Sequence, residues 1–254
     1  MLYDMHCHLD FADKSERIAQ ESAQAQIAAL SCTVVPTSFV SDQDRFAGYE
    51  NIRVSLGMHP WWVADARVSE ADIAHFETLV SEASFIGEIG LDFAERRKGS
   101  KDRQLAVLTR LLQAIHGAGD GRIITFHAVH AATPLMDLLD DLGIFQRNRC
   151  LFHWFQGSSE ELGRAVDRGA VFSVGRRMLA TEKGSRIAAD IPEGQLLLET
   201  DEPAHEGSPW SVAAWREQLE STLSALARLR KVSSSHLEAA LLENAQALLA
   251  HPST

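Results

Sequence analysis

Phe85-Ile-Gly-Glu-Ile-Gly-Leu91 is a short apolar run with one carboxylate inside it, and runs of this kind recur from one end of the chain to the other. Short runs rich in Val, Ile, Leu and Phe predict buried strands of a parallel sheet. We expect eight such strands, near residues 2–8, 32–37, 52–57, 85–91, 122–127, 149–153, 170–174 and 196–200.

Segments with a helical spacing of apolar residues separate these strands. We expect helices near residues 14–30, 71–83, 102–118, 133–142, 159–168 and 184–190, and the segment 42–49 carries the weakest helical signal. Alternating strands and helices are typical of α/β proteins with a parallel sheet. Eight parallel strands in 254 residues predict a TIM (β/α)8 barrel. Leucines between Val212 and Leu249 predict two extra C-terminal helices that cover the barrel, with a break near Ser233-Ser-Ser.

Composition fits one domain that spans residues 1–254, because 45% of the residues are hydrophobic and no segment resembles a linker. The net charge of −11 disfavours tight, non-specific binding to duplex DNA. Since we find neither a membrane span nor a signal peptide, the sequence predicts a cytoplasmic protein. Three cysteines without CxxC spacing predict buried thiols rather than disulfides or a structural zinc cluster.

Residues able to bind a cation lie at or near the ends of five predicted strands. His6 and His8, two positions apart, point the same way from one strand. Glu88, His127, His153 and Asp201 belong to four other strands, and the carboxyl ends of all strands meet at one mouth of a barrel. We therefore expect two divalent metal ions with Glu88 bridging them. The donor set suits Mg, Mn or Zn, as well as cobalt or iron, and does not select among these metals.

Six motifs together resemble the TatD family of metal-dependent deoxyribonucleases, within the amidohydrolase superfamily. They are Asp4-Met-His-Cys-His-Leu-Asp10, Gly57-Met-His-Pro60, Gly87-Glu-Ile-Gly-Leu-Asp92, His127, His153-Trp-Phe-Gln-Gly-Ser158 and Leu197-Leu-Glu-Thr-Asp-Glu-Pro203. Among them, His127 matches the family's histidine on strand five. Residues 153–158 match the family pattern HxFxGS, in which the x at position 154 stands for any residue. The match spans the whole chain in the family's order.

The resemblance implies hydrolysis of DNA phosphodiester bonds by a metal-activated water, often as an exonuclease on single-stranded or frayed ends. It implies that His6, His8 and Asp201 serve one metal, that His127 and His153 serve the other, and that Glu88 serves both. Asp201 would orient the nucleophile and take its proton. Asp201 and Glu88 are thus the predicted catalytic residues, DNA is the predicted partner, and no membrane or obligate protein partner is expected.

Four further residues are predicted to bind substrate. His59 precedes a proline at a strand end, so it either hydrogen-bonds the backbone or contacts a phosphate or a metal ligand. Asp92 has the same alternatives, including orientation of a ligand histidine. Arg97 belongs to a basic segment with Arg96, Lys98, Lys101 and Arg103 that either is a solvated face or guides a phosphate backbone. After strand seven the family has Thr-Phe-Lys, and this chain has Gly175-Arg-Arg-Met-Leu179 instead. Arg176 or Arg177 is therefore predicted to replace that lysine.

The strand-five motif departs from the family. The family usually has Arg-Asp-Ala beginning two positions after the strand-five histidine, whereas this chain reads His127-Ala-Val-His-Ala-Ala132. The missing arginine is a plausible phosphate-binding residue, so its absence bears on the identity of the substrate more than on metal binding. Two alternatives to a DNase therefore stay open: a hydrolase of a small phosphodiester, ester or amide, and a non-catalytic scaffold. His130 and His205 are expected to be surface or substrate residues rather than additional ligands.

Overall fold

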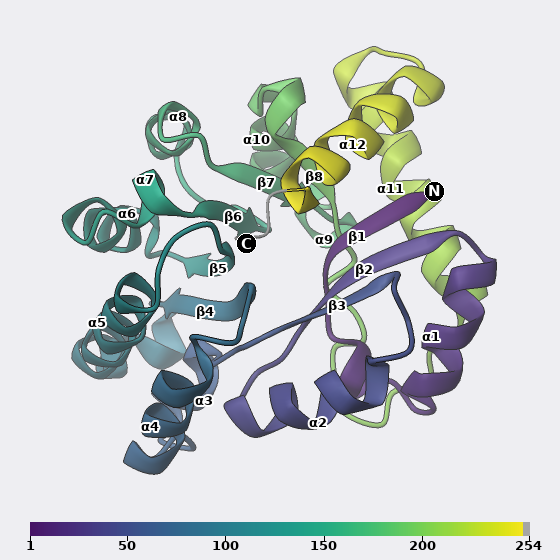
Figure 1. The fold of residues 1–254 in the computed structure, drawn as a ribbon. Helices are drawn as coiled ribbons and strands as arrows, with labels where there is room; N and C mark the ends of the chain where they lie inside the picture. Colours follow the sequence, from purple (N-terminus) through teal and green to yellow (C-terminus); the bar gives the residue numbers. More distant parts are fainter. Residues whose placement is uncertain (251–254) are drawn as a thin grey trace.

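Eight parallel strands alternate with helices in the computed structural model, which describes residues 1–250. The strands are β1 (Leu2–Cys7), β2 (Ile27–Cys32), β3 (Ile52–Ser55), β4 (Phe85–Asp92), β5 (Ile123–Val129), β6 (Arg149–His153), β7 (Val171–Val174) and β8 (Leu196–Leu198). They follow one another in sequence order around the centre, with the helices outside them (Figure 1). This confirms the predicted α/β fold of TIM-barrel type.

All but the last two helices lie between successive strands on the outside of the barrel, and the last two follow the final strand. They are α1 (Ser15–Gln24), α2 (Pro36–Phe46), α3 (Pro60–Ala64), α4 (Glu70–Leu79), α5 (Lys101–Gly117), α6 (Ala132–Asp141), α7 (Ile144–Arg147), α8 (Ser159–Asp167), α9 (Arg176–Leu179), α10 (Glu182–Asp190), α11 (Val212–Arg230) and α12 (Ser234–Leu249). Short 3-10 segments are η1 (Leu9–Phe11), η2 (Glu95–Ser100) and η3 (Glu193–Gln195). None of the helices within residues 1–250 combines the length and the apolar character needed to cross a bilayer.

Hydrogen bonds divide the strands into a three-stranded sheet, β1-β2-β3, and a five-stranded sheet, β4 to β8. The two sheets adjoin at both seams. At the first seam the amide of Gly87 donates to the carbonyl oxygen of Leu56, 2.8 Å away. At the second seam the amide of Asp201 donates to the carbonyl oxygen of His6 over 2.9 Å. The seams bring the end of β1 beside the segment that follows β8.

Asp4 reinforces the second seam from inside the protein. Its buried carboxylate accepts hydrogen bonds from the Thr200 hydroxyl at 2.6 Å and from the Trp215 indole nitrogen at 2.7 Å. The same carboxylate accepts a bond from the Thr200 amide at 3.0 Å. Because Thr200 precedes Asp201 and Trp215 belongs to α11, one side chain links β1, the end of β8 and a C-terminal helix.

The second strand was wrongly predicted. It covers Ile27–Cys32 rather than residues 32–37, and the helix predicted over 14–30 ends at Gln24. The small residues of Ile27-Ala-Ala-Leu resemble a helix continuation, yet every residue of this strand is buried. Pro36 instead begins α2, since its fixed φ and missing N–H suit the first helical turn. The weak helical signal at 42–49 is the end of α2 and the turn after it.

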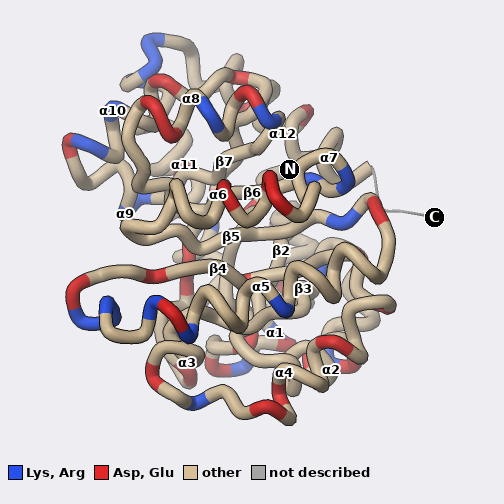
Figure 2. Tube along the Cα trace, turned by 90° about the vertical axis from the view of Figure 1, so that its left-hand side faces the viewer, with Lys and Arg blue, Asp and Glu red and all other residues tan. Residues whose placement is uncertain are grey.

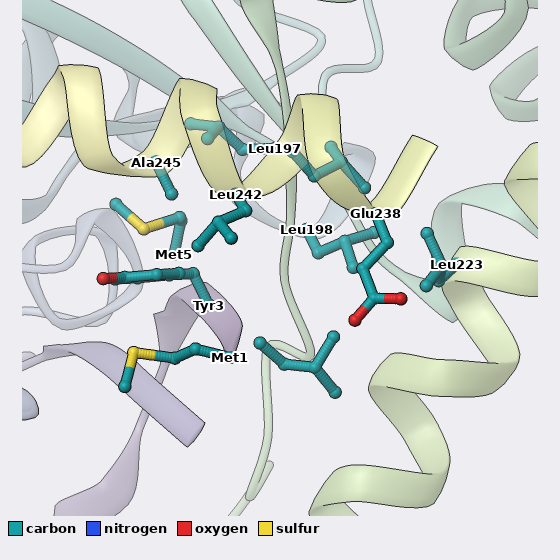
Figure 3. Close-up of a pocket in the computed structure, with 11 residues that line it drawn as sticks. Met1, Tyr3, Met5, Leu197, Leu198, Leu223, Glu238, Leu242 and Ala245 are labelled. Carbon is teal, nitrogen blue, oxygen red and sulfur yellow. The ribbon is translucent and has the colours of Figure 1, made fainter. Parts of the chain in front are cut away.

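The two predicted C-terminal helices are confirmed as α11 and α12, with the break at residues 231–233. Helix α12 covers the amino-terminal end of the barrel, where its Ala245 and Leu248 pack with Met5 and Leu197. Figure 3 shows Ala245, Met5 and Leu197 around the crevice that remains between α12 and β1, which has a volume of only about 10 Å³. Such a space holds at most one water molecule. The barrel base is therefore closed.

The three cysteines lie in the core as free thiols, as predicted. Cys7 points away from its neighbours His6 and His8 and contacts the carbonyl oxygen of Leu30 at 3.7 Å. Cys32, the last residue of the neighbouring strand β2, contacts both of those histidines.

Candidate active site

The six residues predicted as metal ligands converge at the carboxyl end of the barrel. His6 lies in β1 and His8 directly after it, Glu88 lies in β4, and His153 is the last residue of β6. His127 lies inside β5, which continues to Val129, rather than at its end. Asp201 follows β8 with a left-handed φ of 54°. Their roles as metal ligands stay a prediction, whereas their proximity is a feature of the structure.

Glu88 lies at the centre of the cluster, and its two carboxylate oxygens face different histidines. Oε2 lies 3.3 Å from His6 Nε2 and 3.5 Å from His8 Nε2. Oε1 lies 2.6 Å from His127 Nδ1 and 2.8 Å from His153 Nε2. The carboxylate thus divides the histidines into the two pairs that the resemblance implies for two ions.

Asp201 completes the first pair. Its Oδ1 lies 3.4 Å from His8 Nε2 and 3.8 Å from His6 Nε2. Its other oxygen, Oδ2, accepts a hydrogen bond from the Arg177 guanidinium over 2.9 Å. One oxygen of Asp201 therefore faces the histidines, while the second is held from the side by a cation.

Divalent cations fit this cluster because donor atoms without partners point into it. His6 Nε2 and Glu88 Oε2 are both buried and make no hydrogen bond. One donor atom from each of His6, His8 and Asp201 lies within 4.8 Å of the others, and the same holds for His6, Glu88 and His153. A buried acceptor that lacks a donor is costly in water-free surroundings, and a bound cation would remove that cost.

Cys32 contacts the outer nitrogens of both histidines of the first pair. Its carbonyl oxygen lies 2.7 Å from His8 Nδ1, and its Sγ lies 3.5 Å from His6 Nδ1. A proton on each Nδ1 leaves the lone pair on Nε2 facing the cluster. The contacts with Cys32 thus orient both rings with Nε2 toward the cluster.

Carboxylates contact the outer nitrogens of the other two histidines. Asp92 Oδ2 lies 3.4 Å from His127 Nε2, and Glu199 Oε2 lies 3.7 Å from His153 Nδ1. Asp92 also accepts a hydrogen bond from the Trp61 indole nitrogen. The predicted alternative in which Asp92 orients a ligand histidine matches this geometry, since its carboxylate lies behind His127 and beside the cluster rather than inside it.

His59 makes both kinds of contact that the sequence offered as alternatives, one with the backbone and one with a predicted metal ligand. Its Nδ1 accepts a hydrogen bond from the Trp61 amide over 3.0 Å and thereby caps the short helix α3. An amide can only donate, so Nδ1 carries no proton, and the proton of the neutral ring is on Nε2. Nε2 lies 3.2 Å from Glu88 Oε1. Although His59, Glu88 and His127 are close enough to share a cation, this tautomer makes His59 a donor rather than a ligand.

Burial and the two carboxylates together set the charges of the cluster. Burial alone would raise the pKa of Glu88, but the surrounding histidines, His59 and His153 foremost, hold it well below its usual range. Burial alone would lower the pKa of His8, yet its hydrogen bond to Asp201 and the charge of Glu88 raise it to about 9. Burial lowers the pKa of His6 to about 4 and also lowers that of His59, so both rings are neutral at pH 7.

A cavity of about 780 Å³ opens above the cluster. Glu88, His127, His153 and Asp201 form part of its wall. Arg96 and Arg177, which the sequence offered beside Arg97 and Arg176, also line it, as do three residues that the sequence did not single out: Trp61, Trp62 and Trp154. Trp61 and Trp154 each stand within two positions of a motif histidine, and this proximity in sequence was the only available signal for them. The cavity is large enough for a nucleotide or another small organic ester.

The two predicted substrate arginines lie elsewhere. Arg176 is exposed and does not line the cavity, whereas its neighbour Arg177 does. Arg97 is buried against the Trp61 ring, with its Cζ 4.3 Å from the ring centroid, and its Nη1 lies 3.8 Å from Asp92 Oδ2. Arg97 thus supports Trp61 from behind, and Arg96 is the residue of this segment that reaches the cavity.

The basic segment after β4 is not uniformly positive. Lys98 pairs with Glu95, and Arg103 donates to the carbonyl oxygen of Val68. Figure 2 shows the Lys and Arg positions of this segment close to Asp and Glu positions at one edge of the molecule. His130 is exposed, and His205 lies on the cavity rim, as expected for surface or substrate residues.

A family model described as "TatD related DNase" matches residues 3–250. Human deoxyribonuclease TATDN3 is 25% identical over 242 residues, which cover 86% of each chain. The 3′-5′ ssDNA/RNA exonuclease TatD of Dickeya dadantii is 26% identical over 152 residues, which cover 59% of this chain and 56% of that protein.

Solved structures share the fold. The TatD homologue YJJV of Escherichia coli K12 superposes with a TM-score of 0.80 at 24% identity, over 97% of each chain. A TatD family hydrolase of Entamoeba histolytica superposes with a TM-score of 0.78 at 15% identity, also over 97% of each chain. These similarities concern the barrel and its helices.

Proposed function

Because this chain belongs to the family of TatD-related DNases, we propose that it is a metal-dependent hydrolase that cleaves phosphodiester bonds in DNA. The observation that carries the proposal is the position of Glu88, whose two oxygens face separate histidine pairs while Asp201 closes one of them. A structural carboxylate has no need of five surrounding imidazoles. The family match supports an ester-bond hydrolase over a scaffold.

Two divalent cations would be held by this cluster, one by His6, His8 and Asp201 and the other by His127 and His153, with Glu88 between them. Such cations lower the pKa of water and neutralise charge on phosphoryl oxygens. Mg, Mn and Zn all suit a set of imidazoles and carboxylates.

The chain's own groups then have distinct tasks. Asp201 is held ionised, because the hydrogen bond from His8 and the nearby histidines outweigh the effect of burial and keep its pKa below the usual range. An ionised carboxylate beside the cations can orient the attacking water and take its proton. His59 presents an N–H at Nε2 and can donate to a phosphoryl oxygen. Arg177 lies beside Asp201 and adds positive charge at the cavity wall.

Single-stranded or frayed DNA ends are the substrate that the surroundings favour. The relative from Dickeya dadantii is named for 3′-5′ action on single strands, and the net charge of −11 opposes wrapping by a long duplex. We extend the proposal to one functional domain over residues 1–254 that acts without an obligate protein partner. The cytoplasmic location stays a prediction from the sequence.

A small phosphodiester is the second candidate substrate. The arginine expected after His127 is absent, and Val129 lines that part of the cavity instead. A substrate with fewer phosphates would lose less binding affinity when this arginine is absent.

The test uses purified protein and single-stranded DNA labelled at either end, with Mg²⁺ or Mn²⁺ added. Wild type should shorten the DNA progressively from one end, and His127→Ala should abolish the shortening. His130→Ala is the matched control, because His130 is exposed three residues further on, and it should keep wild-type activity. If no protein cleaves DNA while metal is bound, the DNase proposal is wrong and small phosphodiesters become the substrates to assay.

A further inference from the structure

Trp154 differs from the other tryptophans that line the cavity. The Trp61 indole donates to Asp92 and packs against Arg97, and Trp62 lies under the Arg67 guanidinium with 4.6 Å between Cζ and the ring centroid. Within residues 1–250, the Trp154 indole nitrogen donates no hydrogen bond and its ring stacks on no other aromatic ring. A half-buried indole whose N–H has no hydrogen-bond partner among the described residues thus lines the cavity beside the predicted metal ligands.

The backbone directs Trp154 toward the cavity. Its φ is 39°, in the left-handed region that a bulky residue rarely adopts, and its amide donates to the carbonyl oxygen of Ser173 over 3.2 Å. A β-strand would turn residue 154 to the opposite side from His153, whereas this turn lets both side chains line the same cavity. Unfavourable backbone conformations held by their surroundings are concentrated at functional sites.

A cation accompanies the indole. The Arg177 Cζ lies 6.0 Å from the centroid of the Trp154 ring, and Arg177 also contacts Asp201 and Glu202. A flat apolar face next to a guanidinium, both beside the predicted reaction centre, matches a nucleotide, in which a flat base and an anionic phosphate are covalently linked.

We propose that Trp154 is a stacking platform for an unpaired nucleobase at the end of a single-stranded nucleic acid, with Arg177 facing the adjoining phosphate. The proposal rests on the nuclease function above and adds the part of the substrate that is recognised. A base inside a duplex is stacked on its neighbours, so this subsite selects unpaired ends. Stacking accepts every base, which makes recognition tolerant of sequence. Because the whole chain is acidic, stacking rather than counterion release would supply much of the affinity.

The experiment measures binding without cleavage, on the full chain kept metal-free with EDTA. The probes are two fluorescent single-stranded oligonucleotides of equal length and phosphate number, one intact and one with its terminal nucleotides abasic at the end that the enzyme degrades. If no end is degraded, both termini are made abasic in turn. Wild type should bind the abasic probe about 5- to 150-fold more weakly, the factor expected for one stacked base.

Variants decide whether Trp154 causes that discrimination. Trp154→Leu should bind both probes equally, and Trp154→Phe should keep part of the difference because a phenyl ring still stacks. Trp210→Leu is the matched control, since Trp210 is also half-buried but does not line the cavity, and it should discriminate as wild type does. Equal melting temperatures would show that all variants fold.

The outcomes separate this inference from the nuclease proposal. If wild type binds both probes equally, or if Trp154→Leu discriminates as strongly as wild type, the stacking platform is refuted even when DNA is cleaved. If discrimination depends on Trp154 but no nucleic acid is cleaved, the platform stands and the hydrolytic function fails.

Discussion

His59 offers the sharpest test of the site, because its two ring nitrogens have different tasks. Nδ1 accepts from the Trp61 amide, and Nε2 faces Glu88. Asparagine reproduces an acceptor near the Nδ1 position, and glutamine reproduces a donor near the Nε2 position. Three substitutions thus divide the side chain: His59→Asn keeps the helix cap, His59→Gln keeps the inward donor, and His59→Ala keeps neither.

The expected magnitudes follow from these contacts. Loss of the cap costs about 1 kcal/mol, which lowers the melting temperature of a chain of this size by about 2–4 °C. Loss of a donor to a developing oxyanion lowers kcat by about 10²–10³-fold. We therefore expect the kcat loss in His59→Ala and His59→Asn, but less than a tenfold loss in His59→Gln. The melting temperature should fall in His59→Ala and His59→Gln only.

The assays are steady-state cleavage of single-stranded DNA, thermal melting, and metal content after dialysis. All three variants should hold as many metal ions per chain as wild type. A variant that loses one equivalent of metal would refute the argument from the tautomer and make His59 a ligand. Unchanged kcat in His59→Ala would refute its role as a donor.

Three other predictions concern charge and metal. Arg177→Gln should raise KM for DNA by about tenfold or more, as expected for loss of a charge-assisted hydrogen bond, while Arg176→Gln should leave KM unchanged because its side chain is exposed; equal effects in steady-state kinetics would contradict this assignment. Burial, with a contribution from Asp10, raises the pKa of Asp42 to about 7 from 3.8, against the effect of Arg45. The native state therefore binds this proton more tightly than the unfolded state, and stability is lost as pH rises from about 4 to 7, by up to about 4 kcal/mol. Asp42→Asn should unfold at higher denaturant concentration than wild type at pH 8 and lose this advantage near pH 4; an advantage independent of pH would show that ionisation is not the cause. Removal of metal with EDTA should lower the melting temperature, since a ligand at 100 times its Kd adds about 2.7 kcal/mol, and Glu88→Gln should show a much smaller shift on calorimetry; equal shifts would place the metal elsewhere.

Some elements of the fold and site can be predicted from the sequence alone, and others cannot. Seven of the eight strands and the two C-terminal helices were correctly predicted, because burial imposes a local periodicity on the sequence. The second strand was misplaced because Ile27-Ala-Ala-Leu suits a helix as well as a strand, and only its contacts with β1 and β3 decide between them. The six predicted ligands were found because they come from five strands and lie near the same end of the barrel.

Substrate residues were harder to predict. Arg176 and Arg177 are adjacent and chemically identical, and only the direction of the short helix α9 places Arg177 over Asp201 and leaves Arg176 exposed. Arg97 carries the charge expected of a phosphate contact, yet it is buried behind Trp61. The sequence does not reveal the position of Trp154, because it depends on a left-handed backbone conformation and on the place of Arg177 beside its ring.

The sequence by itself determined the fold class, the family and the set of groups available for binding metal, since these depend on residue types and on spacing along the chain. The tertiary structure decided how those groups are used: which oxygen of Glu88 faces which histidines, which nitrogen of His59 holds the proton, and which arginine reaches Asp201. The reason is physical. A tautomer, an ion pair or an exposed ring face is fixed by partners from distant parts of the chain, and those partners become neighbours only when the barrel forms.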